Sequence, residues 1–389
     1  MRPVYLDHHA TTPCAPEVVD ALVPWLRERF GNAASTHAHG SLAAAAADRA
    51  REQVAAAVGR EADEVVFTSG ATEADNLAVL GVAATHRVPG HLISTAVEHS
   101  AIRASLDHLE REGWRITRLQ PGPDGRIVVD EALRALRPDT ALVSVMTANH
   151  ELGTLQPVRE LARACRERGA LFHTDAAQAL GKVDLRGLDA DLVSLSAHKA
   201  YGPQGIGALV VRRRGRPRVA LQPRMLGGGQ ERGLRSGTLP VALVVGFGAA
   251  ARLALRGLDE GEPARLAALR DDLLARLRAL GGVHVHGTLT HRLPHSLNLR
   301  FDGVVAGELL SRIRGEVSCS VGSACASGRV APSPVLKAIG LTDEEALGAV
   351  RLGLGRETTA QDVERAAAAF SHVVTELRAA RVDRVAALR

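Results

Sequence analysis

The stretch DLVSLSAHKAYGPQGIGALVVR, residues 191–212, contains two apolar runs of strand length joined by a polar, glycine-rich turn. Both runs are continuously apolar rather than alternating, which is typical of strands buried on both faces of a sheet. Lys199 lies in the turn, soon after the first run ends. The pattern predicts two buried strands with a polar site where the first one stops.

Similar runs occur earlier in the chain and alternate with amphipathic segments of helix length. Seven strands are predicted in this part of the chain, over residues 64–69, 91–97, 114–120, 141–148, 170–175, 191–196 and 206–212. Helices are predicted before and between them, over residues 41–58, 72–84, 99–112, 130–136 and 157–168. This alternation favours an α/β fold with a mostly parallel sheet covered by helices.

The character of the chain changes near residue 255, beyond which a long charged helix is expected over residues 263–280. Short strands (283–287, 296–301 and 316–321) and helices (304–313, 332–339, 342–348 and 360–380) are expected after it. Because 389 residues exceed what one hydrophobic core usually supports, two domains are expected. We predict a large domain over residues 15–255 and a smaller α+β domain over residues 256–389, with residues 1–14 packed on the smaller one.

Composition argues against several classes of protein. The 48 basic residues are nearly matched by 43 acidic ones, so a net charge of +5 gives little support for direct nucleic-acid binding. Four cysteines without a CxxC pair indicate neither a disulfide scaffold nor a zinc site, so no metal is expected. No apolar segment of signal-peptide length or of the roughly 20 residues needed to span a membrane is evident. We expect a cytoplasmic protein with no membrane association.

The first polar cluster at a strand end is SGATE, residues 69–73. A small, glycine-containing turn at a helix N-terminus offers free backbone N–H groups and the positive end of the helix dipole to an anion. Thr72 adds a hydroxyl, so the turn is a candidate phosphate site. Thr72 with its acidic neighbours could equally cap the helix.

Two further clusters follow later strands. Asp175, in HTDAAQ, ends an apolar run. A protonated ring nitrogen is one partner that would hold such a buried carboxylate ionised, and the alternative is that Asp175 caps a helix N-terminus.

Lys199 is a candidate for a Schiff base, because a desolvated lysine becomes a nucleophile. Most lysines are solvated surface residues, but this chain has only three: Lys182, Lys199 and Lys337.

The last cluster is CSVGSACASG, residues 319–328. Its small residues favour a mobile loop, in which Cys325 would be exposed and reactive. Cys319 lies in the preceding apolar run and is interpreted as a core residue, as are Cys14 and Cys165.

Taken in chain order, these motifs resemble the cysteine desulfurases, which are pyridoxal-phosphate (PLP) enzymes of fold type I related to class V aminotransferases. The similarity also rests on YLDHHATTP (5–13), FGNAASTHAHG (30–40), AVEHSAI (96–102), TANHELGT (147–154), GGGQERGLRSGTLP (227–240) and VRLGLGRETT (350–359). It covers nearly the whole chain, and the HK pair with YGPQGIG and the GSAC loop with PSPVLKAIG are its most specific parts.

The resemblance implies a role for each matching residue. Lys199 would form the Schiff base with PLP, Asp175 would pair with the pyridine nitrogen, and Gln178 would bond the phenolic oxygen. His99 would lie over the ring and act in acid–base steps. The remaining cofactor contacts would come from Ala71, Thr72, His150, Ser196 and His198, with Thr238 of the partner subunit completing the phosphate site in a homodimer. Arg351 and Asn149 would bind the substrate.

The resemblance further implies conversion of L-cysteine to L-alanine, with sulfur held on Cys325 as a persulfide and passed to an acceptor protein. An iron–sulfur scaffold, a tRNA-modifying enzyme or a DNA-modification system are the possible acceptors. The chain has His150 where the family usually has a second asparagine, so the assignment of Asn149 and His150 is open. A histidine there is expected to change charge near neutral pH. A selenocysteine lyase, a class V aminotransferase without the loop cysteine and an inactive scaffold are the alternatives.

Overall fold

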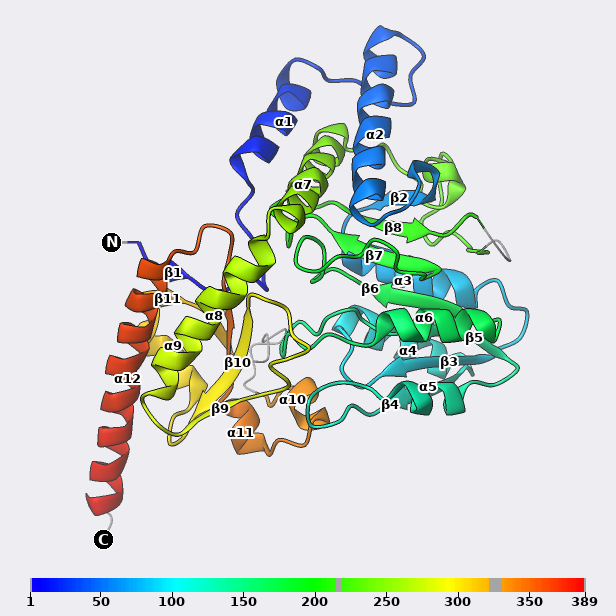
Figure 1. Ribbon diagram of the computed structural model, residues 1–389. Helices are drawn as coiled ribbons and strands as arrows, with labels where there is room; N and C mark the ends of the chain where they lie inside the picture. The colour runs from blue at the N-terminus through cyan, green and yellow to red at the C-terminus, as the bar shows by residue number, and fades with distance from the viewer. Residues whose placement is uncertain (1, 215–218, 322–330, 388–389) are drawn as a thin grey trace.

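The computed structural model describes residues 2–214, 219–321 and 331–387, and these residues form a seven-stranded sheet, a four-stranded sheet and a two-stranded sheet (Figure 1). The larger sheet has seven strands: β2 (Val65–Thr68), β3 (His91–Thr95), β4 (Arg115–Leu119), β5 (Thr140–Ser144), β6 (Leu171–Asp175), β7 (Leu192–Ser196) and β8 (Gly207–Val211). Their order is β2-β8-β7-β6-β5-β3-β4. Strand β8 is antiparallel to both of its neighbours, β2 and β7, and the other adjacent pairs are parallel. Each of the seven predicted runs is a strand, so the predicted fold class is confirmed.

Both faces of this sheet are buried, because successive side chains of a strand point to opposite sides. In β2, Val65 and Phe67 pack into one apolar cluster, whereas Val66 packs into another. The first cluster includes residues of α2, α6 and α7, and the second includes residues of α3 and α4. The continuously apolar runs in the sequence are therefore explained by helices on both faces.

The helices around the larger sheet are α1 (Pro16–Arg27), α2 (Ala38–Ala57), α3 (Ala71–Ala83), α4 (Ser100–Arg111), α5 (Val129–Ala135), α6 (Val158–Glu167) and α7 (Val241–Asp259), with short 3-10 turns at Ala62–Glu64 and Glu231–Gly233. The sequence patterns did not predict α1 or α7. By length and composition α7 could cross a membrane, contrary to the expectation that no segment could. About two thirds (67%) of the most apolar 18-residue segment of α7 is buried inside the protein, as is usual for a core helix.

The C-terminal part contains α8 (Glu262–Arg278), β9 (Val283–Val285), β10 (Ser296–Phe301), α9 (Ala306–Ile313), β11 (Val317–Ser318), β12 (Ser320–Val321), α10 (Pro334–Ala338), α11 (Asp343–Leu347), β13 (Val350–Gly353) and α12 (Ala360–Ala387). Its antiparallel sheet has the order β12-β13-β10-β9. The run predicted as one strand over 316–321 is divided at Cys319 between two sheets, because β11 pairs with β1 (Val4–Tyr5) instead. The predicted domain limits of 15–255 and 256–389 stay predictions.

Candidate active site

A cavity of about 450 Å³ opens beyond the carboxyl ends of β6 and β7, where ligands of parallel sheets bind. Nine of the predicted site residues line it: Ala71, Thr72, His99, His150, Asp175, Gln178, Ser196, His198 and Lys199. Three others, Asn149, Thr238 and Arg351, do not line it, and Cys325 lies outside the described residues. The structure thus brings together side chains that are more than 100 residues apart in the sequence.

One end of the cavity is formed by the N-terminus of α3. The helix begins at Ala71 with Gly70 at its N-cap, and no side chain caps it. The first amides of a helix have no carbonyl partner inside the helix, so the N–H groups there are available to an anion. Gly207 packs against this turn so closely that a Cβ atom would lie 2.7 Å from the Gly70 backbone. The capping role considered for Thr72 is not seen.

Glu73 would disfavour an anion at this helix end if it were unpaired. Its Oε1 accepts a hydrogen bond of 2.9 Å from Nε of Arg235, and its Oε2 accepts one of 2.7 Å from the Ser69 amide. Burial acts to raise the pKa of Glu73, but the hydrogen bonds from Arg235 and Ser69 outweigh it and lower that pKa. The paired carboxylate leaves the turn able to accept a phosphate group.

Asp175 ends β6 and is largely buried in the cavity wall. Its Oδ1 accepts a hydrogen bond of 2.8 Å from the Ala177 amide. Two carboxyls near it have raised pKa values: that of Glu98 rises to about 8 through burial, and that of Asp75 rises through burial and through the charge of Asp175. These raised pKa values favour the uncharged forms of Glu98 and Asp75, which reduces the negative charge beside Asp175.

Lys199 follows β7 in a tightly bonded loop. The amides of Ala200 and Gly202 both donate to the carbonyl of Ala197, at 2.9 and 3.0 Å. Burial lowers the pKa of Lys199 although the charge of Asp175 opposes the shift, and Arg351 lowers it further. A lowered pKa increases the fraction of free amine, which is the form that attacks a carbonyl carbon.

His99 and His150 stand together on another wall, with ring centroids 5.2 Å apart in an edge-to-face arrangement. Nδ1 of His99 accepts a hydrogen bond of 3.2 Å from the Ala101 amide, so the neutral ring carries its proton on Nε2. Burial lowers the pKa of both rings, that of His150 well below 6.5, and the positive charge of Lys199 adds to the effect. The lowered pKa of His150 argues against the expectation that this ring changes charge near neutral pH, and that expectation stays a prediction.

Asn149 and Arg351 lie just outside this cavity. The Asn149 side chain is completely buried, and its Oδ1 accepts hydrogen bonds from the amides of Glu151 and Leu152 at 2.9 and 2.8 Å. Arg351, in β13, donates to the carbonyl of His150 at 3.1 Å and to Oδ1 of Asp7 at 3.0 Å. The Asn149 side chain thus stabilises its own turn, whereas Arg351 contacts the main chain of His150.

The residues on either side of the predicted sulfur loop are attached near the cavity. Ser320 donates a hydrogen bond of 2.7 Å to Oδ2 of Asp7, and Ser333 donates to Oε2 of Glu151. Cys319 contacts the apolar core of the C-terminal part, and burial raises the pKa of its thiol to about 12. Cys319 is therefore a packing residue, as expected, and so is Cys165, which is buried in the main core.

Several residues around the site were not expected from the sequence. Asp7 engages Arg351, Glu98 and Asp75 are the carboxyls that interact electrostatically with Asp175, and Lys182 donates to the backbone of Lys199. The scarcity of lysine was a signal for Lys182, since Lys182 is one of only three in the chain. No comparable signal marked Asp7, whose partner is 344 residues away in the sequence.

Comparison with known proteins agrees with this arrangement. The model of the class-V aminotransferase family matches residues 4–366. A protein named "Cysteine desulfurase IscS" from Methylococcus capsulatus is 47% identical, with 97% of this chain and 93% of that protein covered. A solved NifS-like protein has a TM-score of 0.89 at 33% identity, with 96% of this chain and 100% of that chain covered. SspA, solved in complex with cysteine, has a TM-score of 0.79 at 34% identity, with 91% and 99% covered.

Proposed function

The chain belongs to the class-V aminotransferase family, and we propose that it is a cysteine desulfurase that converts L-cysteine to L-alanine and receives the sulfur on Cys325. The observation that carries this proposal is the meeting of Lys199, Asp175 and His99 in one cavity with a helix N-terminus. Each of these groups suits one part of PLP. The enzyme class is also that of similar proteins which match this chain almost from end to end.

The residues present fit PLP. The α3 N-terminus with Ala71 and Thr72, together with Ser196 and His198, would hold the phosphate, because it offers free amides and hydroxyl groups. Asp175 would pair with the pyridine nitrogen, and Lys199 would hold the cofactor covalently. Bound in this way, PLP supplies an electron sink for the bonds around Cα of the substrate.

The chain's own side chains then bind the substrate and move protons. The lowered pKa of Lys199 lets its amine take up and return a proton at Cα. The lowered pKa of His99 favours its neutral form, whose Nε2–H lies on the opposite side of the ring from the Ala101 amide and can donate a hydrogen bond to the bound substrate. Arg351 would receive the substrate carboxylate in its guanidinium fork, and His150 in place of Asn149 would contact the bound molecules.

Sulfur transfer would be the work of Cys325. Its thiolate attacks the sulfur of cysteine, the carbon–sulfur bond breaks with its electrons passing to the carbon skeleton, and a proton at carbon completes alanine. The product on the protein is a persulfide with no net oxidation. Ser320 and Ser333 support this role, because their hydrogen bonds attach both flanks of residues 322–330 beside Arg351 and His150.

A homodimer, a sulfur-acceptor protein and a cytoplasmic location complete the proposal. Thr238 is exposed and does not line the cavity of its own chain, which supports a role in the site of a second copy. An acceptor is required because the persulfide must be discharged before the next turnover; the name IscS of similar proteins favours iron–sulfur assembly. A cytoplasmic, reducing compartment suits an enzyme that depends on a free thiol.

The test is turnover of cysteine by the wild type and by Cys325→Ala. The variant should bind PLP and cysteine with normal visible spectra, yet form no persulfide and almost no sulfide, while Cys319→Ala should keep most activity. Alanine, sulfide and protein persulfide are measured in the same reaction. Sulfide release by Cys325→Ala at the wild-type rate would contradict transfer through this residue.

A further inference from the structure

Lys182 is a buried cation behind the active site. It follows the loop that begins at Asp175, and only 4% of its surface is exposed. No carboxylate oxygen lies within 4 Å of its ammonium group in the described part of the chain. A buried charge without a close counter-ion is costly, and a hydrophobic side chain of similar length would avoid that cost. We therefore infer that the positive charge of Lys182, or its hydrogen-bond donors, have a role at this position.

The ammonium group contacts the loop that carries Lys199. Nζ of Lys182 donates a hydrogen bond of 2.7 Å to the backbone carbonyl of Lys199 and lies 5.3 Å from the ring centroid of Tyr201. A hydrogen bond from a charged donor to a carbonyl is roughly twice as strong as one between neutral groups. The aromatic ring offers a second favourable contact for the cation. The carbonyl of Lys199 and the aromatic ring of Tyr201 thus take the place of a close counter-ion for Lys182.

Tyr201 needs to be held in place because its backbone is strained. Its φ is +62°, in the left-handed region that side chains other than glycine rarely occupy. The Tyr201 amide donates to Oγ1 of Thr12 at 2.8 Å, and its carbonyl accepts from the Ala15 amide at 3.0 Å. The strained turn directly follows Lys199 and Ala200, so loss of these contacts would let the lysine change direction.

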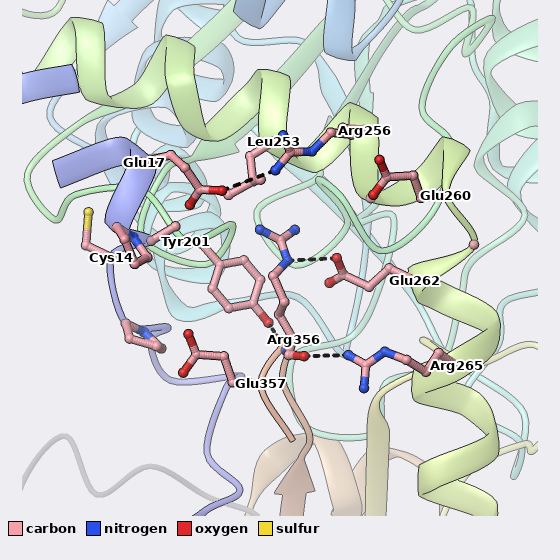
Figure 2. Close-up of a pocket in the computed structure, with 15 residues that line it drawn as sticks. Cys14, Glu17, Tyr201, Leu253, Arg256, Glu260, Glu262, Arg265, Arg356 and Glu357 are labelled. Carbon is pink, nitrogen blue, oxygen red and sulfur yellow. Dashed lines mark hydrogen bonds and ion pairs between the residues drawn. The ribbon is translucent and has the colours of Figure 1, made fainter. Parts of the chain in front are cut away.

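The ring of Tyr201 is held from a second cavity, of about 520 Å³, shown in Figure 2. Its hydroxyl accepts a hydrogen bond of 2.6 Å from the Arg356 amide, and the Arg356 guanidinium lies 4.5 Å from the ring centroid. Glu262 in turn pairs with Arg356 at 2.8 Å. The chain of contacts from Glu262 to Tyr201 joins the C-terminal part of the protein to the turn after Lys199.

We propose that Lys182 is a positioning residue, which together with Tyr201 fixes the backbone of Lys199 so that the reactive amine points at the cofactor. This inference rests on the proposed function, in which Lys199 holds PLP. Burial lowers the pKa of Lys182 to about 8, in spite of the opposing charge of Glu262, so the ammonium form predominates at pH 7 and below. Lys182 needs no contact with PLP or substrate for this role.

The test compares Lys182→Met, Lys182→Gln and Lys182→Arg in the full-length enzyme, with Lys337→Met as the control for loss of an exposed lysine. PLP is added to each apoprotein, and formation of the lysine–cofactor bond is followed by its visible absorbance and by borohydride trapping. Lys182→Met should slow bond formation about tenfold to a hundredfold, the equivalent of one charged hydrogen bond. Lys182→Arg, which keeps a cationic donor, should recover much of the rate, and Lys337→Met should change nothing.

Melting temperature and peptide mapping separate the possible outcomes. Wild-type rates and an unchanged pH midpoint of the visible band in folded Lys182→Met would overturn the positioning role. If Lys182→Met does not fold, the same readings on Lys182→Gln decide: a slow rate with recovery in Lys182→Arg supports the role, and equal rates overturn it. Mapping of the wild type tests the proposed function separately, because label on Lys337 would contradict Lys199, and label on Lys182 would overturn both.

Discussion

The active-site region has two sides that are built in different ways, and most of the second side lies just outside the cavity. The sheet side, which we define as Ala71, Thr72, Asp175, Ser196 and Lys199, comes from the ends of β2, β6 and β7 and the turns that follow them. The junction side, defined as Asp7, His150, Ser320 and Arg351, comes from four separate segments joined by hydrogen bonds. One side is held by the strand ladder and the other by polar contacts between distant segments.

This difference has consequences for chemistry and for tolerance to change. Strand pairing and helices on both faces hold the sheet side, so its side chains have little freedom and their roles cannot be taken over by neighbours. On the junction side, Arg351 shares its donors between Asp7 and a carbonyl, and a substrate carboxylate must compete for them. Substitutions on the sheet side should therefore abolish chemistry, and those on the junction side should change affinity.

The largest effect is expected from Lys199→Ala on the sheet side. Alanine formation should fall by about a thousandfold or more, since positioned proton transfer alone contributes about a hundredfold to ten thousandfold. The visible band of bound PLP should also lose the component that borohydride reduces. Lys199→Arg should be equally inactive, because it keeps the charge but cannot form the bond, and Lys337→Ala should be normal. Activity in Lys199→Arg would contradict the expectation that substitutions on the sheet side abolish the chemistry.

Arg351→Ala on the junction side should raise KM for cysteine about a hundredfold, because loss of one partner of a buried ion pair costs about 2–5 kcal/mol. The value of kcat should fall much less. Arg351→Lys should lie between the two, since it keeps charge but loses the planar fork. Steady-state kinetics at fixed pH give both constants. A loss confined to kcat would mean that Arg351 acts on the chemistry, as the sheet side does.

Asp7→Asn should change KM in the opposite direction. With the carboxylate neutralised, the Arg351 fork no longer has a resident anion, and KM should fall about twofold to fivefold, the equivalent of about 0.4–1 kcal/mol. The melting temperature should decrease, because a buried guanidinium has lost its partner. A rise in KM similar to that of Arg351→Ala would show that Asp7 orients the arginine rather than competing with substrate.

The last expected effect concerns the pH dependence of stability, outside the reaction itself. Burial lowers the pKa of His9, His150 and His295, so these rings stay neutral in the folded protein while the unfolded chain binds protons below pH 6.5. Their stabilising contribution is complete above pH 6.5 and is lost as pH falls. Glu98 has a raised pKa of about 8 and has the opposite effect, because it favours the folded state below pH 4.5 and loses that contribution as pH rises toward 8.

Between pH 6.5 and 4.5 the free energy of unfolding should therefore decrease with falling pH if the imidazoles outweigh the carboxyls. Denaturant unfolding at pH 7, 6 and 5 measures the slope. His295→Asn should reduce the slope by up to about 1.4 kcal/mol per pH unit, the value for one proton. Glu98→Gln should make it steeper by up to a similar amount. A slope that neither substitution changes would mean that these buried groups keep their charges on unfolding.

Sequence by itself determined the sheet side. Seven apolar runs and the turns after them predicted the strands and the strand-end positions of Thr72, Asp175 and Lys199, because main-chain geometry ties a turn to the strand before it. The division of the run at Cys319 between two sheets was not predictable, since strand partners are chosen by packing between distant segments. The roles implied for the predicted residues remain to be tested by substitution.

Tertiary structure decided the junction side. Only the fold brings Asp7 to Arg351, lowers the pKa of His150 and engages the Asn149 side chain in hydrogen bonds within its own turn. The fold also sets Lys182 against the carbonyl of Lys199. Each of these depends on which groups exclude water from a side chain and which supply its hydrogen bonds. Burial and pairing of polar groups depend on the assembled tertiary structure, so they cannot be predicted from the order of residues alone.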